Sequence, residues 1–235
     1  MRLEQGRATR PSEQVVAALA RSLHLETPER DHLYQLAHLP PPVPGRVSSH
    51  IPPGVQRLLA GLGDQPLAVF GADWALLTWT PLWSALLGDP ARIPESRRNL
   101  VLDTFLPPAV PGHWPVRSER GRGAVEAALA ADLRTARATH PDDPGLRRLV
   151  RECKTHSPRF AQLWSQGAVG SHLHDHKTIT HPLVGDITLD CDVLTVPGAD
   201  LKIVAYTTPA GTPAARKLDF LRVTAVNAPV GTDVP

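Results

Sequence analysis

Cysteine is scarce in this chain of 235 residues, which contains only Cys153 and Cys191. Two cysteines are too few for a disulfide scaffold or for a zinc module built on cysteine ligands. A reducing compartment fits this composition best, and we therefore expect a cytoplasmic protein.

An excess of charge and long apolar runs are also missing. Lys and Arg total 25 against 23 Asp and Glu, so the net charge is +2 with the 11 His neutral. This balance argues against a surface built for non-specific binding of nucleic acid or membrane. No apolar run approaches the roughly 20 residues of a membrane-spanning helix, and residues 1–6 lack the apolar core of a signal peptide. We expect a soluble protein with no membrane partner.

Proline is abundant instead, with 25 residues, about twice the usual share of roughly 5%. Five prolines follow a Ser, Thr or Asp that can cap a helix, which is typical of a first helical turn. These pairs are Thr27-Pro28, Thr80-Pro81, Asp143-Pro144, Ser157-Pro158 and Thr212-Pro213. The prolines of residues 40–54 accompany no periodic pattern, and they predict a stiff linker between two parts of the chain.

Two short amphipathic helices are predicted before this linker. Ser12 caps the first, whose apolar stripe is Val15, Val16, Leu19 and Leu23. The second begins at Thr27 and ends before Pro40. Forty residues with two helices bury little surface, so this unit is expected to be marginal alone.

The chain after the linker alternates between strand and helix patterns. Strands are predicted at residues 67–70, 75–79, 187–193 and 201–208, and helices at residues 55–62, 81–87, 99–106, 123–139, 144–154, 158–166 and 213–221. In the third strand, Ile187, Leu189, Cys191 and Val193 alternate with polar residues, so one face is buried. Strands at both ends with helices between them predict an α+β domain on an antiparallel sheet.

Two segments resemble known families. Arg2-Leu3-Glu4-Gln5-Gly6-Arg7 and the helix that follows resemble the end of the Cro/repressor-type (XRE family) helix-turn-helix module. Residues 55–222 resemble the MmyB-like ligand-binding domain. The motifs that carry this second resemblance include, in order, Trp79-Thr80-Pro81-Leu82, His140-Pro141-Asp142-Asp143-Pro144, Ser157-Pro158-Arg159-Phe160 and His181-Pro182-Leu183-Val184-Gly185.

The resemblance implies a bacterial transcriptional regulator with three parts. Residues 1–39 would be the last helices of an all-α helix-turn-helix module, residues 40–54 the linker, and residues 55–225 a PAS-like domain that holds a fatty acid or a similar apolar molecule. Family members begin some fifty residues earlier, so we expect a truncated module that binds DNA weakly, through phosphate contacts from Arg2, Arg7 and Arg10. The alternative is a stand-alone lipid-binding module without DNA binding. A homodimer is left open.

A ligand pocket is predicted from the expected inward faces of this domain. Its residues are Trp79, Trp83, Phe105, Trp164, His181, Ile187, Leu189, Cys191 and Val193. His181 has two interpretations, as a group that orients a ligand head group or, favoured two to one, as a core histidine bonded to a backbone carbonyl. The resemblance places Cys191 where a larger aromatic residue is frequent, which would enlarge the pocket.

His172, His174 and His176 form an alternating run, with Asp175 and His181 nearby. On an extended strand, alternate residues share a face, so three imidazoles could meet one metal ion. We favour the alternative of a polar loop or edge strand, and we predict neither a metal site nor a cofactor.

Catalytic patterns are missing from the sequence. Asp142-Asp143 is a pair of carboxylates, but Asp143 is better placed as a helix cap. Nucleophile-elbow, phosphate-loop, zinc-protease and dinucleotide motifs are absent. We therefore do not expect an enzyme, and we assign no catalytic residue.

Overall fold

The computed structural model of this chain describes residues 11–23, 25–39, 41, 45–107, 116–167, 169–170, 174–196 and 199–226. It begins with two helices that contact each other, α1 (Glu13–Ser22) and α2 (Thr27–Leu36), both where the sequence predicts them. Val16, Ala20 and Tyr34 are their buried residues.

The start of α2 differs from the prediction in its cap. Glu26 is the residue before the first turn, and its backbone N–H donates to the Glu29 carboxylate over 2.9 Å. Glu26 and Glu29 form a capping box, which satisfies backbone donors that the first turn leaves free. The predicted Thr27 cap is therefore wrong, because Thr27 is already the first helical residue.

Residues 45–50 lead to α3 (Pro53–Gly61) and contact distant parts of the chain. The N–H of Val47 donates to Asp143 Oδ2 over 3.0 Å, and the N–H of Ser48 donates to Asp200 Oδ2 over 3.3 Å. His50 lies 3.0 Å from Glu13 of α1. This part of the linker is therefore held against the domain that follows it. The domain limits at residues 39/40 and 54/55 stay a prediction.

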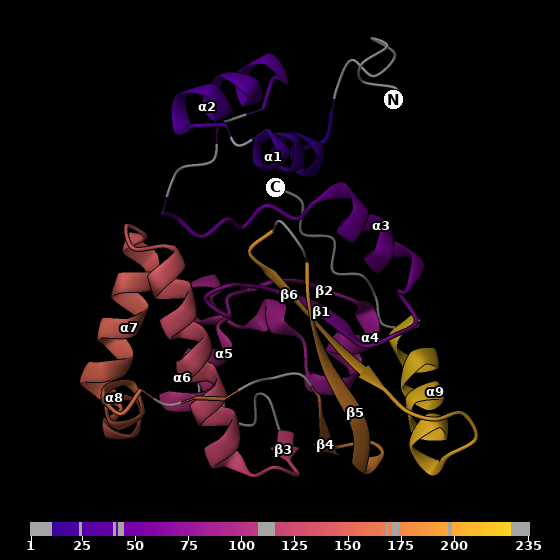
Figure 1. Cartoon of the computed structure of the whole chain (residues 1–235). Coiled ribbons are helices and arrows are strands. Elements are labelled where there is room, and N and C mark those ends of the chain that lie inside the picture. Colours follow the sequence, from indigo (N-terminus) through magenta and orange to yellow (C-terminus); the bar gives the residue numbers. More distant parts are fainter. Residues whose placement is uncertain are drawn as a thin grey trace.

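Six antiparallel strands form one sheet, as the α+β prediction requires. They are β1 (Leu67–Gly71), β2 (Leu76–Trp79), β3 (Val116–Ser118), β4 (His174–His181), β5 (Gly185–Thr195) and β6 (Leu201–Thr207). Their order in the sheet is β2-β1-β6-β5-β4-β3, so β1 pairs with β6, which is far from it in the sequence, and β2 lies at the edge beyond β1 (Figure 1). The sequence did not predict β3, which has three residues, and it left the histidine run ahead of Lys177 as a polar loop or an edge strand. In the structure, His174 and His176 belong to β4, which pairs with β5 along its whole length and with β3 only at Lys177–Ile179.

The helices between β2 and β4, and the one after β6, follow the predicted pattern. They are α4 (Pro81–Leu87), α5 (Leu100–Phe105), α6 (Arg122–Thr139), α7 (Pro144–His156), α8 (Pro158–Ser165) and α9 (Pro213–Val226), with 3₁₀ turns at Pro90–Arg92 and Glu95–Arg97. Thr80, Asp143 and Ser157 accept backbone N–H groups at the starts of α4, α7 and α8, which confirms these three predicted caps. No helix in the described part of the chain is long and apolar enough to cross a membrane.

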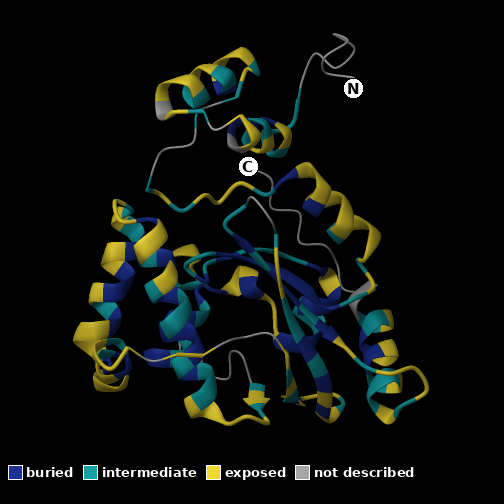
Figure 2. Cartoon of the chain, in the orientation of Figure 1, coloured by how far each residue is buried: buried dark blue, intermediate teal, exposed yellow. Residues whose placement is uncertain are grey.

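The two faces of the sheet differ in what covers them. We call the face with Phe70, Cys191 and Tyr206 the pocket face; it packs against α4 to α7 and α9 in the main core (Figure 2). On the other face, the outer face, β1 and β6 are covered by apolar residues of α3 and its surroundings. The outer face of β4 and β5 carries polar residues that are exposed or half-buried.

Candidate ligand pocket

A cavity of about 560 Å³ lies between the pocket face of the sheet and helices α4, α5 and α6. This volume falls within the roughly 300–1,000 Å³ that is typical of small-molecule sites. Its apolar wall consists of Phe70, Trp74, Trp83, Leu100, Val116, Val125, Val193 and Val204. Its polar wall consists of Asp103, Thr104, Arg117, Ser118, Arg122, Lys177, Cys191 and Tyr206. The arrangement suits a mainly apolar molecule with one polar end.

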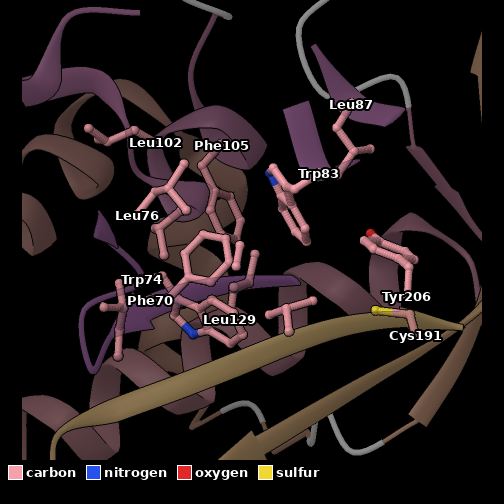
Figure 3. Close-up of a cluster of buried hydrophobic side chains, with 14 of the residues drawn as sticks. Phe70, Trp74, Leu76, Trp83, Leu87, Leu102, Phe105, Leu129, Cys191 and Tyr206 are labelled. Atoms are coloured by element: carbon pink, nitrogen blue, oxygen red, sulfur yellow. The ribbon is translucent and has the colours of Figure 1, made fainter. Parts of the chain in front are cut away.

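Four aromatic rings form a continuous part of this wall (Figure 3). The ring centroid of Phe70 is 5.4 Å from that of Trp74 and 6.1 Å from that of Trp83. Trp83 in turn lies 5.5 Å from Tyr206. These tilted and edge-on contacts are the geometries that aromatic rings prefer, and they fix rigid walls with few rotatable bonds.

Trp74 is held in a left-handed backbone conformation, with a φ of 62°. Such a conformation is uncommon for a bulky residue and persists only where neighbours enforce it. The Trp74 carbonyl accepts the N–H of Leu100 over 3.0 Å, and its indole Nε1 donates to Asp132 Oδ2 over 3.0 Å. The turn between β1 and β2 thereby directs a large apolar side chain into the pocket wall.

Lys177 brings a cation to the pocket wall with only 14% of its side chain exposed. Its Nζ lies 3.9 Å from Asp175 Oδ2, an oxygen that also accepts the Ser118 hydroxyl over 2.5 Å. A lysine ammonium has three donors, and one contact at 3.9 Å leaves donor capacity toward the cavity. An acidic group of a ligand would match it.

Burial keeps the thiol of Cys191 and the phenol of Tyr206 neutral. It raises the pKa of Cys191 to about 11 and raises the pKa of Tyr206 well above its usual value. The two side chains also hydrogen-bond to each other across β5 and β6. At neutral pH they offer polar contacts to a ligand, and the thiol is a poor nucleophile because reactivity requires the thiolate.

Asp103 adds a carboxyl group that titrates near neutrality. Burial raises the pKa of Asp103 to about 7, against the opposing effect of the Arg97 guanidinium. A protonated Asp103 can donate a hydrogen bond, whereas an ionised one would repel an acidic ligand.

Lys202 is a second lysine near the pocket, and it contacts the ring of Trp74. Lys202 Nζ lies 5.0 Å from the centroid of the Trp74 ring and 3.4 Å from the carbonyl oxygen of Ala72. Burial lowers the pKa of Lys202, and the charge of Asp132 opposes that shift. This contact fixes the ring, so we assign Lys202 a structural part in the pocket.

The structure places the predicted pocket residues in two groups. Trp83, Cys191 and Val193 line the cavity. Among the residues that the structure describes, the lining does not include the other six, which are Trp79, Phe105, Trp164, His181, Ile187 and Leu189.

Contacts in the core and at the surface explain these positions. Phe105 packs edge-on against Phe160, at 5.0 Å between centroids, and Trp164 stacks on the same ring at 5.5 Å. Ile187 and Leu189 are each 1% exposed within the main core. Trp79 is only partly buried. Any direct ligand contact from these side chains stays a prediction.

His181 is buried, and both its ring nitrogens have backbone partners. Nε2 lies 2.8 Å from the Ala85 carbonyl, and Nδ1 accepts the N–H of Leu183 over 3.2 Å. These are the contacts of the core histidine that the sequence analysis favoured.

Several pocket residues escaped the sequence analysis. The period of two in β6 places Lys202, Val204 and Tyr206 on one face, and this signal could have identified them. Asp103 and Trp74 carried no such signal, because a helix and a turn bring them to the pocket. The predicted phosphate contacts Arg2, Arg7 and Arg10 lie outside the described residues, as does His172.

Comparison with known families now adds to this geometry. Residues 51–221 match the family model of the MmyB-like transcription regulator ligand binding domain. The match covers every strand and all helices from α4 to α8. No curated protein gives a significant match to the chain.

Proposed function

This chain belongs to the MmyB-like transcription regulator ligand-binding domain family, and on that premise we propose that it is a bacterial regulator that senses a fatty-acid-like molecule. The observation that carries the proposal is the cavity of about 560 Å³ with apolar walls and Lys177 at its polar side. We propose binding without catalysis, since the Cys191 thiol is neutral, and we propose no cofactor.

Burial of an acyl chain would supply the affinity. Each buried methylene contributes about 0.8 kcal/mol, so a ten-carbon segment contributes about 8 kcal/mol before ordering costs. That is sufficient for micromolar binding or tighter after those costs are subtracted. Trp74, Trp83 and Val204 would contact the chain.

The cationic side chains of the wall would select an acid over a neutral lipid. Lys177 is the most buried of them, and its carboxylate partner is 3.9 Å away. Arg117 and Arg122 are more exposed, and they pair with Asp186 and Glu126 at 2.7 and 2.8 Å. We propose that the carboxylate of the ligand binds Lys177, with the two arginines attracting it at the rim.

Ligand binding would reach the N-terminal helices through the linker. Asp143 at the start of α7 holds Val47, and His50 pairs with Glu13 of α1. These contacts could differ between two conformations of the chain. A ligand that binds one conformation more tightly would make it more populated and would thereby change the orientation of the N-terminal helices. We propose that those helices belong to a DNA-binding module, in which Arg2, Arg7 and Arg10 contact phosphates.

Native mass spectrometry of the purified full chain tests the proposal. We expect a mass increment that corresponds to a long-chain acid, and that increment should disappear after extraction with an organic solvent. A protein that carries no increment and takes up no added fatty acid would contradict the proposal. The same spectrum gives the number of subunits.

A further inference from the structure

The outer face of β4 and β5 brings together four side chains that can bind metal. His174 and His176 alternate along β4, and the strand register places Asp192 opposite His174 and Asp190 opposite His176. All four therefore project from one face, at the corners of a square. The histidine run alone does not reveal these two aspartates, which follow on β5 after a turn.

Distances within this square are short. His174 Nδ1 lies 2.9 Å from Asp192 Oδ1, and His176 Nδ1 lies 3.0 Å from Asp190 Oδ1. The two imidazole rings are 5.3 Å apart between centroids. One ligand atom from each of His174, His176 and Asp190 can be chosen so that all three lie within 4.8 Å of one another.

We propose that this face binds one divalent transition-metal ion through His174, His176 and Asp190, with Asp192 as fourth ligand or as the partner that orients His174. Two ligand atoms that each lie about 2.0–2.2 Å from a tetrahedral Zn²⁺ are roughly 3.3–3.6 Å apart. A spread of 4.8 Å needs only a small rotation of two imidazoles, and both are about half exposed. Carboxylate partners for metal-bound histidines are usual in protein sites.

The ligand set favours Zn²⁺, Ni²⁺ or Co²⁺ over Ca²⁺ and Mg²⁺. Imidazole nitrogens suit the transition metals, whereas Ca²⁺ and Mg²⁺ prefer sites made of oxygen. Both strands are paired along the whole square, so the backbone positions are fixed before the ion binds. An open groove that includes His176 and Asp190 leaves the ion access from solvent.

Within the described part of the histidine-rich segment, the pleat directs Asp175 and His181 away from this site. Asp175 faces the opposite side of the sheet and accepts the Ser118 hydroxyl. His181 is buried against Ala85. The metal site is therefore separate from the ligand pocket, and it stands whether or not the pocket binds a fatty acid.

A titration with ZnCl₂ tests this proposal. The full chain is produced without a histidine tag and is treated with a chelator beforehand. We expect one equivalent to bind saturably by calorimetry and to raise the melting temperature, and Co²⁺ at the same site to give a visible absorption band. The double variant His176→Ala, Asp190→Asn should lose at least tenfold in affinity, with an unchanged melting temperature in chelator.

A matched control separates a metal site from an ordinary His–carboxylate pair. His50 lies 3.0 Å from Glu13 and is also about half exposed, but the described structure groups no second histidine with it. His50→Ala should leave Zn²⁺ affinity unchanged. The proposal fails if Zn²⁺ binds no tighter than millimolar, or if the double variant binds as the parent does.

Discussion

Lys177 is a lysine on the inward side of a strand, where long cationic side chains are rare. It lines the cavity together with apolar residues, and its ammonium lies 3.9 Å from the carboxylate of Asp175. A largely buried cation with incomplete pairing costs free energy, and a bound carboxylate would recover part of it.

Replacing Lys177 with Met should weaken the binding of a long-chain fatty acid about 10- to 100-fold, since a hydrogen bond to a charged group contributes about 1.5–3 kcal/mol. The matching fatty alcohol should bind both proteins alike. Calorimetry on both ligands measures the difference. Lys154→Met is the control, because it removes a charge that lies on α7 over the Trp164 ring. It should change neither the affinity for the fatty acid nor that for the fatty alcohol. Equal losses for the acid and the alcohol would show that Lys177 acts only by packing.

Asp103 makes stability depend on pH. Its pKa in the folded chain is about 7, above the 3.8 of an unperturbed carboxyl, so the folded state holds more protons between these values. Stability from this group is therefore greatest below about pH 4 and falls as pH rises to about 7. Asp103→Asn should be more stable than the parent at pH 8 by about 2 kcal/mol, after a discount for partial exposure. Urea unfolding at pH 5 and pH 8 measures this, and parallel pH dependences would contradict it.

The first half of β4 could not be predicted with certainty as a strand from the sequence. Its first four residues are all polar, so the pattern gave no apolar side to identify. In the sheet, Asp175 and Lys177 face the pocket, while His174 and His176 face Asp192 and Asp190. The role of each polar residue depends on its cross-strand neighbour, and the local sequence does not show which strands pair.

Helix starts, by contrast, are local and were largely predictable. A Ser, Thr or Asp before a proline satisfies the first free N–H groups through its own side chain. Asp143 does this for Leu146 over 2.6 Å, and its second oxygen also holds the linker at Val47. That second contact spans 96 residues and no local signal could reveal it.

Asp143→Ala should therefore destabilise the chain by about 2–3 kcal/mol and also release the linker. Asp143→Asn keeps one acceptor oxygen instead of two, so its stability should lie between that of Asp143→Ala and that of the parent. Urea unfolding measures the first effect, and the rate of tryptic cleavage after exposed Arg46 measures the second. Asp142→Ala, one residue away and exposed, is the control. If Asp143→Ala is cleaved at the parent's rate, the linker contact is not what holds the segment.

At the scale of the whole molecule, the fold was predictable and the pocket only in part. Alternation and helix periodicity gave the α+β class, because each strand and helix shows its own apolar face. The pocket lining comes from β1, α4, α5, β3, α6, β4, β5 and β6, and the sheet order brings the strands among them together. The large aromatics were assigned to the pocket mainly on the family resemblance, since size alone explains a core position equally well, and Phe105 packs against Phe160 in the core.

The central claim is that this cavity holds an acyl chain, and Cys191 tests it most directly. Cys191 is 3% exposed, lies on the pocket wall and has a small side chain. Replacing it with Trp should fill part of the 560 Å³. Leu194→Trp places the same side chain at an exposed position of β5 and serves as the control.

Calorimetric titration of a long-chain fatty acid into the three proteins is the deciding measurement. We predict saturable micromolar binding to the parent and to Leu194→Trp, and at least tenfold weaker binding to Cys191→Trp with its fold retained by circular dichroism. Equal binding by all three proteins, or no saturable binding of any acyl chain to the parent, would contradict the account.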